Sequence, residues 1–279
     1  MPGSERSAPG TGRGHLLRSI ARRLRRRGGR SRQAAGGGIT VGTMGTAEER
    51  REELKAVWQQ ASACTRCPQL AAARKTVVFG SGNADADLMF VGEAPGARED
   101  EQGVPFVGQA GRLLDTLLGE IGLTRGEVFV TNVLRCRPPQ NRDPLPSEID
   151  NCQEYLFRTL DLIQPRVVCT LGNFATKLLR GDQTGITRLH GREEIRRIGP
   201  RTVRLYPIYH PAAALYTPSM LETLRGDFAR LPELLALPAP EQPEPDEVVE
   251  PVVVEEPEAV LEPEAPLEPE PHPAQLSLF

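Results

Sequence analysis

The 279-residue chain lacks any apolar run of the roughly 18 residues that a membrane-spanning helix needs. It also lacks the short apolar stretch that marks a secretory signal peptide. We therefore expect no membrane contact and a cytoplasmic location, in the bacterial cytoplasm or nucleoid. Only five cysteines are present, and cytoplasmic cysteines rarely form structural disulfides. These absences exclude membrane proteins and disulfide-stapled secreted domains.

The N-terminal end has almost no negative charge, and the C-terminal end has no positive charge. Residues 1–46 contain ten arginines and one acid, whereas residues 239–279 contain twelve acids and no Lys or Arg. Neither end has enough apolar residues to bury a core. We predict three parts: a disordered basic Gly/Arg-rich segment (1–46), a globular domain (47–237), and a disordered acidic Pro/Glu-rich tail (238–279). The basic segment is interpreted as a nucleic-acid-binding arm, as a transit peptide, or as an extension before a true start at Met44.

Short apolar runs alternate with amphipathic stretches through the middle of the chain. The apolar runs predict strands at 87–92, 127–133, 166–172 and 203–210. The amphipathic stretches predict helices at 47–62, 109–123, 147–164, 173–180 and 219–235, with Ser147 as an N-cap. Continuously apolar strands between helices are typical of a parallel sheet covered on both faces. We predict an α/β fold, a three-layer α/β/α arrangement around a central, mostly parallel four-stranded sheet.

Four of the five cysteines form a pattern. Cys64 and Cys67 are a CxxC pair, and Cys136 and Cys152 bracket the Pro-rich loop "RPPQNRDPLP". Four thiolates suit either a tetrahedral zinc or an iron–sulfur cluster, and the spacing does not separate the two. Cys169 lies inside a predicted strand and is interpreted as a buried apolar residue.

Polar residues follow three of the predicted strands, where α/β sheets bind ligands. Glu93 and Glu99 follow the first strand, Asn132 the second and His210 the fourth, while Phe106 lies in the loop "VPFVG". A carboxylate can position water, an Asn can read the edge of a base, and a Phe can stack on a ring. Core packing for Phe106 and loop capping for Asn132 are the ordinary alternatives. Together the five residues indicate a pocket for a flat, polar, uncharged ring.

The motifs "GEAPG" with a following "ED", "PFVG.AGRLL", "TNVLRCRPPQNRDP" and "HPAA" resemble those of family 4 uracil-DNA glycosylases, the thermostable iron–sulfur branch of the uracil-DNA glycosylase superfamily. The resemblance covers roughly residues 50–235 and implies a uracil-DNA glycosylase fold. It implies hydrolysis of the N-glycosidic bond of deoxyuridine in DNA, which leaves an abasic site for base excision repair. It also implies a 4Fe–4S cluster, rather than zinc, on Cys64, Cys67, Cys136 and Cys152.

The resemblance assigns the uracil contacts residue by residue. It places uracil against Gly92, Glu93, Ala94, Phe106, Asn132 and His210. Phe106 is expected to stack on the base, Asn132 to read its edge and reject cytosine, and His210 to stabilise the charge of the departing ring. Glu93 is the expected water-positioning carboxylate, with Glu99 as the second candidate.

Contacts to DNA are expected outside the uracil pocket as well. Arg135, Arg137 and Arg142 flank the loop after Cys136 and are expected to reach phosphates. Leu215 or Tyr216, shortly after His210, is expected to enter the base stack that uracil leaves.

The last five residues, QLSLF, follow a spacer with nine prolines in residues 241–279. They resemble the bacterial sliding-clamp-binding pentapeptide Gln-Leu-x-Leu-Phe. We expect Gln275, Leu276, Leu278 and Phe279 to bind a DNA polymerase sliding clamp and so to tether a monomeric enzyme near DNA.

Two other functions remain open from the sequence. One is a non-catalytic iron–sulfur module that binds uracil or DNA and is associated with replication. The other is a zinc-stabilised α/β hydrolase that acts on a free nucleoside.

Overall fold

The structure, a computed structural model, describes residues 46–243. The basic segment up to residue 45 and the acidic tail from residue 244 lie outside the described residues. The QLSLF terminus lies outside them too, so what the sequence predicts for these segments, and the domain boundaries drawn from it, stay predictions.

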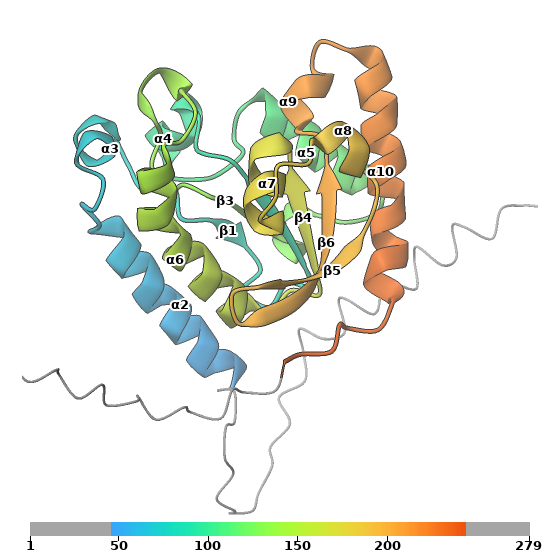
Figure 1. Ribbon diagram of the computed structural model, residues 1–279, viewed down its shortest axis with the longest axis horizontal. Coiled ribbons are helices and arrows are strands. Elements are labelled where there is room, and N and C mark those ends of the chain that lie inside the picture. Colours follow the sequence, from blue (N-terminus) through green and yellow to red (C-terminus); the bar gives the residue numbers. More distant parts are fainter. Residues whose placement is uncertain (1–45, 244–279) are drawn as a thin grey trace, which may run out of the picture. The chain divides into compact units, whose positions relative to one another are not determined.

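One mixed sheet forms the centre of the described residues, with the strand order β1-β3-β2-β4-β6-β5 (Figure 1). The four predicted strands form its parallel middle: β2 (Leu88–Gly92), β3 (Phe129–Asn132), β4 (Val167–Leu171) and β6 (Arg201–Ile208). Two antiparallel edge strands extend it, β1 (Ser81–Gly82) and β5 (Glu194–Ile198). The predicted α/β fold with a mostly parallel sheet is confirmed.

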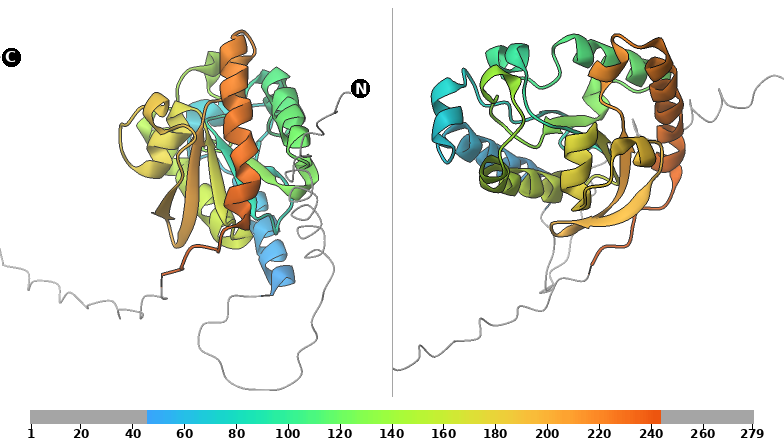
Figure 2. Two further views of the ribbon diagram at one scale, coloured as in Figure 1. Left: turned by 90° about the vertical axis from the view of Figure 1, so that its right-hand side faces the viewer. Right: turned by 45° about the horizontal axis from the view of Figure 1, so that its top comes forward.

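Helices cover both faces of the sheet (Figure 2). On one face, α2 (Ala47–Ser62), α6 (Pro146–Ile163) and α7 (Asn173–Arg180) share a hydrophobic core with strand residues such as Met89 and Val91. On the other face, α5 (Gln109–Glu120) and α10 (Pro218–Ala236) pack on Leu88 and Phe90. Successive residues of β2 thus point to opposite cores, as the period of a strand requires. This arrangement is the predicted α/β/α sandwich.

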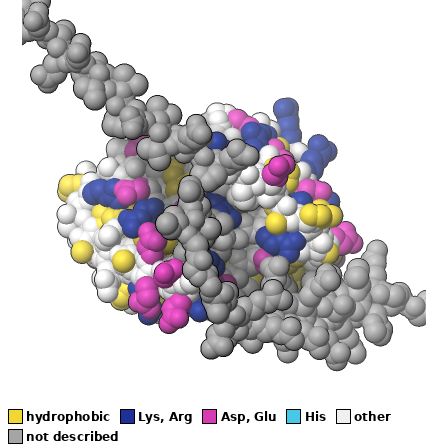
Figure 3. Space-filling view, turned by 90° about the horizontal axis from the view of Figure 1, so that it is seen from below, with side chains coloured by type: hydrophobic (Ala, Val, Ile, Leu, Met, Phe, Trp, Pro, Cys, Tyr) yellow, Lys and Arg dark blue, Asp and Glu magenta, His cyan; other side chains and the backbone are white. Residues whose placement is uncertain are grey.

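Short elements fill the connections between the strands and the longer helices. They are α3 (Pro68–Ala73), α4 (Ala97–Gln102), α8 (Ile186–Leu189), α9 (Pro211–Ala214) and the 3-10 turns η1 (Arg125–Glu127) and η2 (Pro139–Asn141). Among residues 46–243, no helix is long and apolar enough to cross a bilayer. On the side opposite the strand carboxyl ends, Lys/Arg and Asp/Glu side chains are interspersed over the visible surface (Figure 3).

The start of α6 differs from the prediction. The helix begins at Pro146, so Ser147 lies inside its first turn instead of capping it. The cap comes from Glu148, whose carboxylate accepts the backbone N–H of Leu145 at 2.9 Å. Proline is favoured in the first helical turn because the missing N–H has no partner there anyway.

Candidate active site and cysteine-lined cavity

A cavity of about 420 Å³ opens at the carboxyl ends of β2 and β3. Four segments far apart in the sequence supply its walls: the turn after β2, the loop that enters α5, the end of β3 with the loop after it, and the start of α9. The sequence-predicted residues that line it are Glu93, Ala94, Glu99, Phe106, Asn132 and His210. The structure therefore brings six of the seven predicted pocket residues to one cavity.

Gly92, the seventh, lies behind the cavity wall. It is the β2 partner of Asn132 in the parallel register. A Cβ atom at Gly92 would overlap the side-chain oxygen of Asn132 and lie 2.8 Å from the ring of Phe106. Glycine is therefore required here because two pocket side chains occupy the space that any other side chain needs.

Phe106 has an unusual backbone conformation. Its φ of 54° lies in the left-handed region, which costs energy for a bulky residue. The side chain is buried, and its ring centroid lies 5.6 Å from that of His210 with the planes 28° apart. The conformation aims the aromatic ring at the cavity, so the surrounding contacts must hold the strained loop in place.

Three contacts hold that loop. Glu99 Oε1 accepts the backbone N–H groups of Val107 at 3.2 Å and Gly108 at 3.1 Å. The guanidinium of Arg125 donates to the carbonyl oxygens of Pro105 and Phe106. Glu99 therefore positions the Phe106 loop, a role that the amino-acid sequence did not indicate.

The third contact comes from Gly111 in the first turn of α5. A Cβ atom at Gly111 would overlap the carbonyl group of Phe106 and lie 3.0 Å from its Cα. The backbone of the strained loop thus rests directly on the helix. The sequence contains this glycine in "AGRLL", but its role depends on a contact that no sequence pattern reveals.

His210 joins β6 to α9. Pro211 starts the helix and disfavours a helical conformation for the residue before it, so His210 is extended and the chain turns at the strand end. Nδ1 of His210 accepts the backbone N–H of Ala212 at 3.1 Å. Burial lowers the pKa of His210 to about 4, although the charge of Glu99 acts to raise it. The ring is therefore neutral at pH 7, and its remaining proton is on Nε2.

Glu93 follows β2 and lines the cavity. Burial raises the pKa of its carboxyl group, and the negative charge of Asp143 acts in the same direction. In the described part of the chain, no hydrogen bond engages this carboxylate, whereas one oxygen of Glu99 already has two donors. Glu93 is thus the carboxylate available to a water molecule.

The arginines differ in their surroundings. Arg135 is only 1% exposed, so the expectation that it contacts DNA phosphates is wrong. Arg137 donates to the side chain of Asn141 at 2.7 Å, and Arg142 lines the cavity. Contacts from Arg137 and Arg142 to phosphate stay predictions. Of the two wedge candidates, Tyr216 is 84% exposed.

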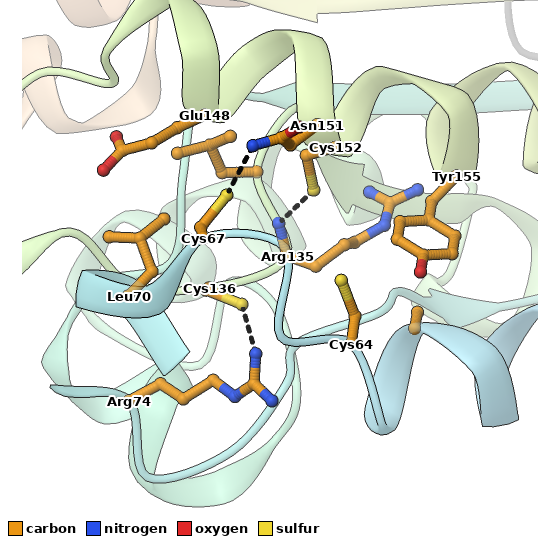
Figure 4. A pocket seen from close by; sticks show the side chains of 12 residues that line it. Cys64, Cys67, Leu70, Arg74, Arg135, Cys136, Glu148, Asn151, Cys152 and Tyr155 are labelled. Atoms are coloured by element: carbon orange, nitrogen blue, oxygen red, sulfur yellow. Dashed lines mark hydrogen bonds between the residues drawn. The ribbon is translucent and has the colours of Figure 1, made fainter. Parts of the chain in front are cut away.

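A second, small cavity, of about 20 Å³, is lined by all four patterned cysteines (Figure 4). Cys64 and Cys67 come from the turn between α2 and α3, Cys136 follows β3, and Cys152 lies in α6. Cys169 is apart from them and fully buried in β4, as predicted. The rest of the cavity wall mixes apolar residues with Arg74, Arg135, Glu148 and Asn151.

Three of the four sulfurs accept a hydrogen bond: Arg74 Nη1 donates to Cys136 at 3.1 Å, the Arg135 N–H to Cys152 at 3.3 Å, and Asn151 Nδ2 to Cys67 at 3.6 Å. Burial acts to raise the pKa of Cys64, but the neighbouring Tyr155 and Arg66 outweigh it and leave the pKa below its usual value. Such donors favour thiolates, the form in which cysteines bind metals, but burial still raises the pKa of Cys67, Cys136 and Cys152.

The chemistry of the donor set fits a metal–thiolate centre, because four sulfurs from three segments line one cavity. Four thiolates suit an iron–sulfur cluster or a tetrahedral zinc.

Residues that are close together in the sequence line both cavities. Arg142 lines the first and Glu148 the second, and the two side chains form hydrogen bonds of 2.9 and 2.6 Å. This bidentate ion pair lowers the pKa of Glu148. The Pro-rich loop between Cys136 and Cys152 thus forms part of the first cavity while its ends border the second.

The packing of Gly111 on Phe106 generates a testable prediction. Gly111→Ala should push the Phe106 loop out of the cavity and weaken uracil binding about tenfold, the order of one lost aromatic stack. Inhibition of the enzyme by free uracil measures this. The control is Gly119→Ala in the same helix, where an added Cβ meets nothing within 4 Å. Equal inhibition constants for the two variants would contradict the assigned role.

Several known proteins are similar to this chain in sequence. The family profile described as the uracil DNA glycosylase superfamily matches residues 79–231. A type-4 uracil-DNA glycosylase of Sulfurisphaera tokodaii is 42% identical over 192 residues, which cover 67% of this chain and 87% of the relative. One from Archaeoglobus fulgidus is 44% identical over 188 residues, 66% of this chain and 94% of the relative. One from Thermotoga maritima is 41% identical over 167 residues, 60% of this chain and 85% of the relative.

The match to the superfamily spans more than half of the chain and includes the first cavity with Glu93, Phe106, Asn132 and His210. The type-4 relatives are covered over most of their own length. The chain therefore belongs to the uracil-DNA glycosylase superfamily and, within it, to the type-4 uracil-DNA glycosylases.

Proposed function

We propose that the cavity at the ends of β2 and β3 is the active site of a uracil-DNA glycosylase, which hydrolyses the N-glycosidic bond of deoxyuridine in DNA and leaves an abasic site for base excision repair. The type-4 relatives carry this activity in their names. The observation that carries the proposal is the convergence of Glu93, Phe106, Asn132 and His210 on one cavity. The reaction is a hydrolysis, which a non-catalytic binding module would not perform.

Uracil recognition follows from the side chains around the cavity. The base must leave the duplex stack to reach such a site, and Phe106 offers a new stacking surface. The Asn132 amide can accept the N3–H of uracil with its oxygen and donate to O4 with its nitrogen. Cytosine presents an acceptor at N3 and an amino group at C4, so both contacts become unfavourable. Asn132 is only 2% exposed, so an unmatched polar contact there is costly.

His210 acts on the leaving group. As the glycosidic bond breaks, negative charge develops on the uracil ring and its oxygens. A neutral imidazole whose Nδ1 already accepts from Ala212 presents an Nε2–H donor. A fixed donor in a water-poor site stabilises such charge without changing its own protonation state.

Glu93 acts on the sugar side of the bond. Its carboxylate can hold the attacking water and stabilise the positive charge that develops on the sugar. Burial raises the pKa of Glu93 toward neutral pH. A general base is most effective when its pKa lies near the pH at which the enzyme works. Glu99 contributes by holding the Phe106 loop, and its role as the alternative water-positioning carboxylate stays a prediction.

Substitutions at the proposed site test the function. His210→Ala and Glu93→Gln should each lower kcat about 100-fold or more with the fold intact, since each removes a group that acts in the transition state. The assay is alkaline strand scission of an oligonucleotide that contains uracil. His190→Ala is the matched control, because His190 pairs with Asp227 away from the cavity. Absence of scission by the wild-type protein, or equal rates for His210→Ala and His190→Ala, would refute the proposal.

We further propose that Cys64, Cys67, Cys136 and Cys152 bind a 4Fe–4S cluster. The supporting observations are four sulfurs around one cavity and hydrogen-bond donors to three of them. When bound, the cluster supplies four Fe–S bonds that cross-link the turn after α2, the segment after β3 and helix α6. Burial raises the pKa of Cys136 to about 11, so the metal centre would also keep this thiol ionised.

The cluster can be tested by replacing its ligands. The purified protein should contain about four iron atoms per chain and absorb near 400 nm, whereas a zinc protein would be colourless. Cys136→Ala should lose the absorption and most of the iron. Cys169→Ala is the control, because this cysteine lies in β4 and should leave both unchanged. Zinc in place of iron, or full iron content in Cys136→Ala, would overturn the assignment.

The remaining partners are proposed on the sequence. Uracil-containing DNA is the substrate, and Tyr216 is the exposed side chain next to α9 that can enter the vacated stack. Clamp binding by Gln275, Leu276, Leu278 and Phe279 concerns residues outside the described part of the chain. It stays a prediction, as do the monomeric state and the cytoplasmic location.

A further inference from the structure

Arg135 is among the largest fully buried side chains of the described residues. It stands three residues after Asn132 and directly before Cys136. Its guanidinium donates to the side-chain oxygen of Thr131 and the backbone carbonyl of Asn132, and at 3.4 Å to Thr159. It also lies over the ring of Phe79, 5.1 Å from the centroid. All these partners are neutral.

The charge of Arg135 therefore needs another counter-ion. In the described part of the chain, no carboxylate forms an ion pair with it, and Nε has no hydrogen-bond partner. A buried cation without an opposite charge is strongly destabilising. Arg135 lines the cysteine cavity, whose one carboxylate, Glu148, is paired with Arg142. Burial lowers the pKa of Arg135, whereas the charges of Cys152 and Cys136 act to raise it, and its backbone N–H donates to Cys152 (Figure 4).

Arg135 also contacts Asn132, which lines the proposed uracil cavity. Its guanidinium holds the carbonyl oxygen of Asn132, the last residue of β3, whose side chain lines the active-site cavity. Between them, Leu134 donates its N–H to the carbonyl oxygen of Glu93 at 3.0 Å. One short segment, residues 132–136, thus connects a uracil-reading side chain to a cysteine ligand.

We propose that Arg135 is a positioning residue that uses the negative charge of the cysteine-bound centre as its counter-ion and its fork of N–H groups to hold Asn132 in the orientation that reads uracil. The inference rests on the proposed function, because it takes the two cavities to be a uracil site and a metal-thiolate site. It predicts that removal of this one charge affects both cavities.

A matched pair of variants of the full chain tests the proposal. Arg135→Met removes the charge and the fork. Arg74→Met removes a charge that also donates to a cysteine sulfur, Cys136, but that makes no contact with Asn132. Two quantities are measured: the reduction potential of the cluster, followed by its visible absorption, and the inhibition constant for free uracil, which reports on the pocket without the chemical step.

Both variants should shift the reduction potential to lower values, because a cation near a cluster favours the reduced form. Only Arg135→Met should weaken uracil inhibition, by about tenfold, the order expected when a hydrogen bond from a charged group is lost. Arg74→Met should stay within about twofold of the wild type. Wild-type uracil inhibition in Arg135→Met, or equal weakening in both variants, would overturn the proposal.

Arg135→Lys separates charge from geometry and serves if Arg135→Met does not fold. A lysine keeps the charge but has one nitrogen, which cannot replace both Nη1, the donor to Thr131 and Asn132, and Nη2, the donor to Thr159. Its reduction potential should stay close to that of the wild type, while uracil inhibition weakens several-fold; unchanged inhibition would contradict the positioning role. A wild-type protein without iron or without uracil inhibition would instead refute the proposed function itself.

Discussion

The parallel register of β2 and β3 sets Gly92 beside Asn132, and the rest of the site depends on that pairing. The absence of a side chain at Gly92 leaves room for both the Asn132 amide and the Phe106 ring. Beyond the strand ends the two segments stay together, because Val133 donates to Gly92 and Leu134 to Glu93. Asn132, the proposed reader of the base, and Glu93, the proposed water-positioning carboxylate, are therefore held by the same ladder of backbone hydrogen bonds.

A strained residue, Phe106, and a buried charged residue, Arg135, lie next to this edge of the sheet. Phe106 keeps a left-handed conformation because Glu99, Arg125 and Gly111 leave its loop no other position. Arg135 is buried beside the cysteine cavity, where the proposed metal–thiolate centre would supply its counter-ion. Both features cost free energy in isolation and persist only where neighbouring contacts compensate. Local strain and buried charge of this kind are common at functional sites.

Much of the fold follows from residue patterns, because apolar strands and amphipathic helices leave clear periodicities. The predicted helix at 47–62 coincides with α2, and four predicted strands are the parallel centre. The edge strands leave no clear pattern in the sequence. β1 has two residues, and in β5 the part-buried Glu194 and Arg196 alternate with the exposed Ile195 and Arg197. Site residues at strand ends were predictable for the same topological reason, whereas the roles of Glu99, Gly111 and Arg135 were not. Those roles arise from contacts that no residue period encodes, such as those of Glu99 with Gly108 and of Gly111 with Phe106, or from the burial of a residue type that is normally exposed.

The central claim is that one cavity at the ends of β2 and β3 binds the excised base. A crystal structure of the protein soaked with uracil tests it most directly. The account predicts the ring stacked on Phe106, its N3–O4 edge against the Asn132 amide, and a ring oxygen within hydrogen-bond distance of His210 Nε2. Uracil bound elsewhere, or with that edge turned away from Asn132, would contradict the account.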